Sequence, residues 1–200
     1  MSKRLILVAA PPAHGKNYVS ERLCEALGNV VYLDKDDFAP LLGCAFSLCG
    51  ESVDMDGSFY LENLRKAEYE TLFQLAYRAL RFADTVLVNA PFLREVRDAC
   101  YMRDLKERAA HLGAELILIW VHASADACYE RMKKRGALRD EKKLARWEDY
   151  LKGTDRNAPL ALQEAQAIDR LIVFDNENED AASSSLREAL AVLIDSEPKK

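Results

Sequence analysis

The chain has 200 residues, of which 50% are hydrophobic and 30% are charged. That length fits one domain, or one domain with a small lid, and the composition allows a sizeable buried core. The net charge of −5 argues against a general nucleic-acid or membrane-surface binder, because such binding depends on clustered cations. No apolar run in the sequence reaches the roughly 18 residues of a membrane-spanning helix.

The predicted elements alternate between strand and helix along the chain. Short apolar runs rich in β-branched residues predict five strands, at Leu5–Ala9, Val30–Leu33, Thr85–Val88, Leu116–Val121 and Leu171–Phe174. Continuous apolar strands indicate burial on both faces, which is typical of a parallel sheet with helical crossovers. We therefore expect one three-layer α/β domain over residues 1–200.

The first strand leads into the strongest motif. It runs through Ala10 and Pro11 into a tight turn ending in Gly15-Lys16, and a helix is expected from about Asn17 to Leu27. This context is typical of a phosphate-binding loop, in which loop amides and a helix N-terminus face an anion. The expected nucleotide-binding residues are Pro12, Ala13, His14, Gly15, Lys16, Asn17 and Tyr18.

Two positions depart from the phosphate-loop pattern. Ala10 stands where the motif has its first glycine, and Asn17 stands where it has a magnesium-ligating hydroxyl. An asparagine oxygen can coordinate Mg²⁺ or hold one of its waters, so Asn17 is the candidate metal ligand. The alternative is an ordinary strand-to-helix turn with a surface lysine.

An acidic cluster, Asp34-Lys35-Asp36-Asp37, follows the second predicted strand. Loops at the carboxyl ends of parallel strands build the active crevice of such folds, so this cluster should face the same crevice as the phosphate loop. A carboxylate there can orient a substrate hydroxyl, accept its proton or hold metal-bound water. One Asp could instead cap a helix, but three exceed what a cap needs.

Two further segments have unusual composition. Residues 47–58, between Phe46 and Phe59, contain the glycines and polar residues of a mobile loop, which either selects a substrate or is merely structural. Residues 131–146 hold eight cations and two anions, a local charge of +6. That segment indicates either a local polyanion partner or a solvated amphipathic helix.

The five cysteines include no Cys-x-x-Cys pair, and their number is odd. This argues against a disulfide framework and against a zinc knuckle. The prolines at 11 and 12 break the first apolar run, so we interpret it as a strand and not as a signal peptide. Reduced cysteines predict a cytoplasmic protein.

The phosphate loop, the acidic cluster and the segment from Ala123 to Asp140 together resemble the small P-loop kinases. This group includes gluconate kinase, chloramphenicol phosphotransferase and the zeta-toxin proteins, and its members are often labelled AAA-family ATPases. The resemblance runs from about Leu5 to Phe174 and implies a P-loop fold with a short helical lid at about 131–146, with ATP and Mg²⁺ as cofactors.

The resemblance also implies roles for individual residues. Lys16 and Asp36 would be catalytic, together with the lid arginines Arg131 and Arg135, and Arg139 would bind the nucleotide. Asp34, Asp36 and Asn89 would face the substrate. Related sequences often have Asp at the position of Asn89, so this chain lacks a charge there.

The function expected from these observations is ATP-dependent phosphoryl transfer to a small hydroxylated acceptor. Two alternatives stay open: a nucleotide-binding protein with little catalysis, which the residues at positions 10, 17 and 89 favour, and a polynucleotide kinase that uses the +6 segment. The acidic balance of the rest of the chain argues against nucleic acid as a partner. The sequence names neither the acceptor nor an oligomeric state.

Overall fold

A computed structural model describes residues 3–194, without the side chains of residues 138 and 139. The five predicted strands are all present in that range, each extended by one to three residues. The strands are β1 (Lys3–Ala9), β2 (Val30–Asp34), β3 (Thr85–Asn89), β4 (Ala114–His122) and β5 (Arg170–Asp175). No helix within the described range is long and apolar enough to cross a membrane.

Helical elements connect the strands and surround them. The α-helices are α1 (Lys16–Leu27), α2 (Ala39–Leu48), α3 (Arg65–Ala79), α4 (Ala99–Ala110), α5 (Ala125–Arg135), α6 (Leu138–Ala145), α7 (Trp147–Gly153), α8 (Ala161–Glu164) and α9 (Glu179–Ile194). Short 3₁₀ turns lie at η1 (Lys35–Phe38) and η3 (Glu95–Arg97), and one π-helical turn, η2 (Tyr60–Leu64), leads into α3.

The sheet formed by the described strands has the order β2-β3-β1-β4-β5, and every neighbouring pair is parallel. β1 lies in the middle, with Leu5 opposite Val86 of β3 and Leu116 of β4. The order changes direction on either side of β1. Loops that leave such a switch point diverge and open a crevice at the carboxyl ends of the strands.

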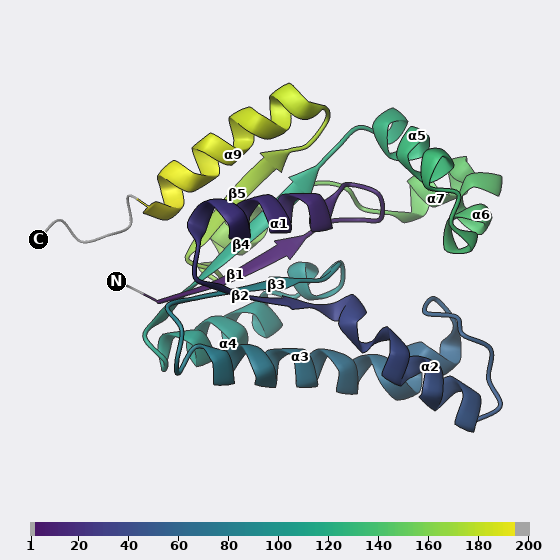
Figure 1. Cartoon of the computed structure of the whole chain (residues 1–200), viewed down its shortest axis with the longest axis horizontal. Coiled ribbons are helices and arrows are strands. Elements are labelled where there is room, and N and C mark those ends of the chain that lie inside the picture. The colour runs from purple at the N-terminus through teal and green to yellow at the C-terminus, as the bar shows by residue number, and fades with distance from the viewer. Residues whose placement is uncertain (1–2, 195–200) are drawn as a thin grey trace, which may run out of the picture.

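Helices cover both faces of this sheet, which gives the three layers expected from the sequence. α1 and α9 lie on one face, and α3 and α4 lie on the other (Figure 1). Successive side chains of a strand point to opposite faces. Ile6 and Val8 accordingly pack in the core under α1 and α9, whereas Leu5 and Leu7 pack in the core with α3 and α4. Burial on both faces explains why β1 is apolar without interruption.

The elements beyond the carboxyl ends of the strands are helical to a greater extent than the sequence indicates. α2 continues through Leu48, and helical structure resumes at Ser58, so the loop expected over 47–58 shortens to about 49–57. The lid expected over 131–146 is formed by the end of α5 and by α6, and α7 follows it. In Figure 1 the lid helices and α2 lie on opposite sides of the same end of the sheet.

Candidate functional site

The phosphate loop turns through two left-handed residues. Ala13 has φ of 65° and Gly15 has φ of 87°. A Cβ atom on Gly15 would lie 2.2 Å from Nδ2 of Asn176, so no other residue fits there without a rearrangement. Ala13 adopts a conformation that is costly for a residue with a side chain, a departure from the favoured geometry that the sequence does not reveal.

The backbone carbonyl groups of this loop contact donors from two other segments, the turn after β5 and helix α5. Nδ2 of Asn176 donates to the carbonyl oxygen of His14 over 2.7 Å. The Arg131 guanidinium lies 3.5 Å from the carbonyl oxygens of Ala13 and His14, and it donates to the Asn176 carbonyl over 2.5 Å. No described side chain caps the start of α1. A helix N-terminus of this kind suits an external anion.

The His14 side chain anchors the loop instead of facing a ligand. It is 1% exposed, and its Nδ1 lies 3.1 Å from the Pro12 carbonyl and 3.4 Å from Sγ of Cys128 on α5. Burial lowers the pKa of His14 to about 4, so the imidazole is neutral at pH 7. Burial also raises the pKa of the Cys128 thiol to about 11, which keeps it protonated.

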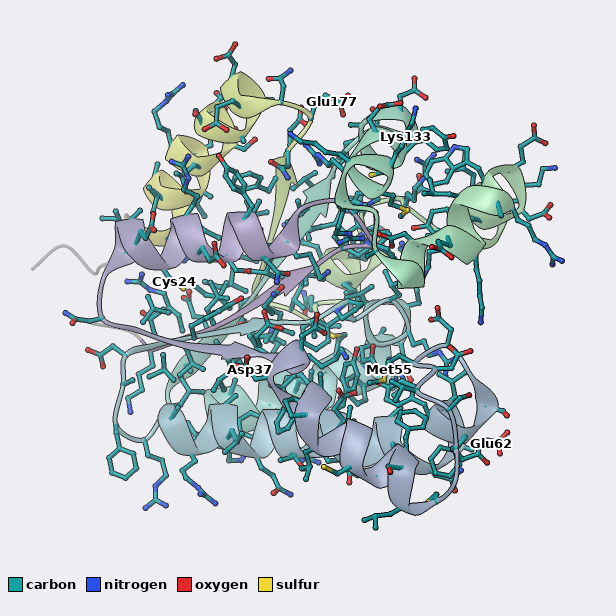
Figure 2. The ribbon with its side chains drawn as sticks, turned by 45° about the vertical axis from the view of Figure 1, so that its right-hand side comes forward. Cys24, Asp37, Met55, Glu62, Lys133 and Glu177 are labelled. Carbon is teal, nitrogen blue, oxygen red and sulfur yellow. The ribbon has the colours of Figure 1, made fainter. Side chains whose placement is uncertain are left out.

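A cleft of about 900 Å³ joins the phosphate loop to the acidic cluster and the lid. The nucleotide and catalytic candidates that line it are Pro12, Ala13, Gly15, Lys16, Asn17, Asp34, Asp36, Asn89, Arg131 and Arg135. Met55, on the loop between α2 and α3, also lines it and lies between α2 and the lid (Figure 2). A second hollow of about 310 Å³ adjoins Gly15 and is lined partly by Tyr18, whose hydroxyl donates to Glu179.

Four polar side chains meet where the phosphate loop approaches β2 and β3. Nδ2 of Asn89 lies 3.0 Å from Oδ1 of Asn17 and 2.7 Å from Oδ2 of Asp34. The Tyr32 hydroxyl donates to the same Asp34 oxygen over 2.8 Å. The pKa of Tyr32 is raised, first by burial and then by this hydrogen bond, so the hydroxyl stays protonated.

Asp34 and Asp36 of the acidic cluster have different surroundings. Asp34 accepts from Tyr32 and Asn89 through one oxygen and from the backbone N–H of Asp36 through the other, over 2.9 Å. The Asp36 side chain is 56% exposed and lies 3.6 Å from Nζ of Lys35. Lys35 in turn pairs with the buried Glu68 over 3.2 Å. Asp34 is thus fixed in place, whereas Asp36 faces the open cleft.

Among the described side chains, four of the eight cations of the +6 segment are engaged within the molecule: Arg131, Arg135, Lys142 and Lys143. Lys142 pairs with Asp54 over 3.3 Å and Lys143 pairs with Asp56 over 3.2 Å, which ties α6 to the loop between α2 and α3. Arg135 makes a two-pronged contact with the buried Asp140, over 2.8 and 2.9 Å. Lys133 is exposed and lies on the side of α5 away from Met55 (Figure 2). The four engaged cations all line the cleft.

Several residues of this site are not predicted by the sequence. Asn176 is 162 positions from the carbonyl that it contacts, and no local motif marks it. Tyr32 could have been found, because it precedes Asp34 by two positions and so shares its strand face. The side chain of Arg139, expected to bind the nucleotide, lies outside the described part of the chain. Among the described residues, no group of three or more His, Cys, Asp or Glu side chains is arranged to hold a metal ion.

Comparison with solved structures shows the fold. A candidate kinase from Chloroflexus aurantiacus has 18% identity and a TM-score of 0.59 over 95% of this chain and 98% of its own. A sugar kinase from Janibacter has 17% identity and a TM-score of 0.56, over 96% and 95%. A shikimate kinase from Acinetobacter baumannii has 17% identity and a TM-score of 0.51, over 99% and 97%. These likenesses confirm the predicted P-loop kinase fold.

Comparison with known sequences shows the family. No curated protein matches the sequence. The family model AAA_33, described as an AAA domain, matches residues 5–156 and so spans the phosphate loop, the acidic cluster and the lid. The chain therefore belongs to this AAA-domain family of P-loop proteins.

Proposed function

We propose that the protein is an ATP-dependent phosphotransferase that acts on a small hydroxylated acceptor. The observation that carries the proposal is the shared cleft, which places Lys16 and the start of α1 in the same cavity as Asp34 and Asp36. Phosphoryl transfer needs a phosphate cradle and an acceptor-orienting carboxylate within one site, and catalysis comes mainly from positioning and charge stabilisation.

The contacts within the cleft support separate roles for its charged residues. Lys16 neutralises charge on the outer phosphates, and the smaller hollow beside Gly15 and Tyr18 receives the nucleoside. Asp36, with its carboxylate open to the cleft, orients the acceptor hydroxyl or accepts its proton. Asp34 holds the local structure, because hydrogen bonds already engage both of its oxygens.

The two lid arginines act differently in this proposal. Arg131 fixes the loop carbonyls and stays beside the phosphates. Arg135 reaches a phosphate only after its pair with Asp140 opens, since that pair engages two of its nitrogens. An arginine fork binds a phosphate in the same two-pronged way, so a nucleotide competes directly with Asp140.

Magnesium fits this cleft as an ion delivered with the nucleotide. Mg²⁺ favours oxygen ligands and is usually held by substrate phosphates, waters and one or two carboxylates, without a protein cage. The carboxylate of Asp36 lines the cleft together with Lys16 and suits that arrangement. When bound, the ion offsets negative charge that develops on the phosphates.

The charges at the acceptor end favour a neutral or cationic acceptor over an acid. Four aspartates, Asp34, Asp36, Asp54 and Asp56, line this end of the cleft. Lys142 and Lys143 offset the charges of Asp54 and Asp56, whereas the single charge of Lys35 is shared between Asp36 and the buried Glu68, so Asp34 and Asp36 leave this end negative. A carboxylate on the acceptor would meet these aspartates without a dedicated arginine among the described residues of this end.

The test is ADP production with acceptors that share a carbon skeleton and differ in charge. Glucose, glucosamine and gluconate form one such set, and small alcohols, amino alcohols and hydroxy acids form a second. We expect turnover with neutral or amino-bearing members to exceed turnover with the acids. Turnover with the acids alone contradicts the charge argument, and the absence of turnover with all acceptors, despite ATP binding, contradicts the kinase proposal.

The hydrogen bond between Asn17 and Asn89 favours a second candidate, a nucleotide-binding protein with little catalysis. Two amides occupy positions where the family resemblance implies a hydroxyl and a carboxylate. ATP binding of ordinary affinity without turnover in the acceptor sets supports this alternative over the kinase.

A further inference from the structure

We propose that Asn17 and Asn89 act as one coupled pair. Their hydrogen bond holds the amide oxygen of Asn17, so that this oxygen does not ligate Mg²⁺. Asn17 is then a positioning residue, and the metal ion that accompanies the nucleotide has no direct ligand at this position. The inference rests on the proposed function for its nucleotide, but the pairing itself is independent of any ligand. The two residues are 72 positions apart, and their amides lie 3.0 Å from each other.

Asp34 fixes the orientation of both amides. A carboxylate only accepts hydrogen bonds, so the group that faces it at 2.7 Å must be the NH₂ group of Asn89. Rotating the Asn89 amide by half a turn would place two acceptor oxygens against each other. The second N–H of this group has two acceptors in range, Oδ1 of Asn17 at 3.0 Å and the Tyr32 hydroxyl at 3.2 Å, and the Asn17 oxygen is the nearer. The charge of Asp34 thus sets the direction of the whole chain of hydrogen bonds.

This arrangement of the two amides has a cost in folding free energy, which arises at the side-chain oxygen of Asn89. Asn89 is 1% exposed, and its Oδ1 is buried with no hydrogen-bond partner among the described residues. A buried unpaired acceptor destabilises the folded state, so the amide is kept in this orientation against a penalty. The contacts of its NH₂ group with Asp34, Asn17 and Tyr32 account for that orientation.

The pair makes the two departures from the phosphate-loop pattern interdependent. Asn89→Asp alone would place a second carboxylate about where the NH₂ group lies, facing Asp34, and like charges that close repel. Asn17→Ser alone would take away the Oδ1 acceptor of Asn17, one of the three acceptors that Asn89 contacts. Both changes together would leave a hydroxyl and two carboxylates on the cleft wall, a set of oxygens that suits Mg²⁺.

The experiment compares thermal unfolding of the natural protein, Asn17→Ser, Asn89→Asp and the double variant, without nucleotide, in EDTA and in MgCl₂. Ionic strength is matched with KCl, and Asn63→Ser, on the exposed side of η2, is the control. We expect Mg²⁺ to leave the melting temperature of the natural protein and the control unchanged. It should raise that of the double variant by about 3–6 °C at tenfold excess over its dissociation constant.

Two results of this cycle overturn the proposal. The first is additivity in EDTA, where the melting-temperature changes of the two single variants sum to the change of the double variant. Uncoupled residues behave in that way. The second is a Mg²⁺-specific stabilisation of the natural protein that Asn17→Ser removes, because it would make Asn17 a direct ligand.

A second variant covers the case in which Asn89→Asp does not fold. Asn17→Ala removes the Oδ1 acceptor and introduces neither a charge nor a metal ligand. We then expect the ratio of ADP affinity with Mg²⁺ to ADP affinity without Mg²⁺ to be the same in Asn17→Ala as in the natural protein. A much smaller ratio in Asn17→Ala overturns the proposal. If ADP binds neither protein, the proposed function fails, and the unfolding temperatures of the natural protein and the variants that fold still decide whether the two amides are coupled.

Discussion

The two ends of the cleft are held in different ways. The phosphate-loop end is fixed by short contacts to backbone carbonyls, from Asn176 and Arg131, and by the buried His14. The acceptor end is closed by ion pairs between α6 and the loop at 49–57, in which the Lys142 side chain is 86% exposed and that of Asp56 is 81% exposed. Buried contacts preorganise a site, whereas exposed ion pairs open and close easily. The nucleotide end should therefore be rigid and the acceptor end adjustable.

The largest effect expected is on catalysis at the boundary between these ends. Asp36→Asn keeps the shape of the side chain and removes its ability to accept a proton. Phosphoryl transfer should fall by about 10²–10⁴-fold, with ADP affinity unchanged. The measurement is single-turnover transfer together with calorimetric ADP binding. Asp37→Asn, at an exposed position that does not line the described cleft, is the matched control and should be nearly silent.

A larger loss of transfer in Asp34→Asn than in Asp36→Asn would show that the carboxylate roles are assigned in the wrong order. Asp34→Asn should mainly lower stability, because it disturbs the hydrogen bonds from Tyr32 and Asn89.

The free energy of unfolding should fall in mild acid because of His14, which lies at the rigid end. The folded state holds His14 neutral with a pKa of about 4, whereas the unfolded state binds a proton near 6.5. The contribution of His14 is thus complete above pH 6.5 and is lost as the pH falls from 6.5 toward 4. Between pH 7 and pH 5 this amounts to about 2 kcal/mol. Urea unfolding at pH 5, 6 and 7 measures it.

The variant His14→Gln removes the titrating group, so its unfolding free energy should change less over the same pH range. His111→Gln, at an exposed position, is the control and should keep the slope of the natural protein. An equal slope in His14→Gln would show that another group causes the acid sensitivity.

The smallest effect is expected at the adjustable end. The double variant Asp54→Asn with Asp56→Asn removes both ion pairs between the loop and α6. The KM for the acceptor should rise about two- to fivefold at low salt, because exposed pairs contribute little, and the difference should shrink in high salt. Glu70→Gln breaks an exposed pair on α3 and should leave the KM unchanged.

ADP affinity, measured in parallel, should be the same in the double variant and the natural protein. A loss of ADP affinity equal to the rise in KM would show that the two ends do not behave separately.

The fold is largely predictable from the sequence, because the strands are continuous apolar runs and the three central ones, β3, β1 and β4, are buried on both faces of the sheet. The phosphate loop is predictable for a similar reason: Gly15 and Lys16 stand at a strand-to-helix turn. The partners of these residues are not predictable. The contacts of Arg131 with loop carbonyls and of Lys142 with Asp54 join segments about 90 to 120 positions apart, and no periodicity encodes them. The sequence also gives no sign that α2 extends into the expected loop.

The direct test of the central claim is nucleotide affinity at the phosphate loop. Calorimetric titration with ADP or a non-hydrolysable ATP analogue, in the presence of Mg²⁺, compares the natural protein with Lys16→Ala and with Lys133→Ala as the control. Because Lys16→Ala removes one charge-assisted contact, its nucleotide affinity should fall about ten- to hundredfold. The control should match the natural protein. Equal affinities in all three proteins would contradict the assignment of this loop as a phosphate site.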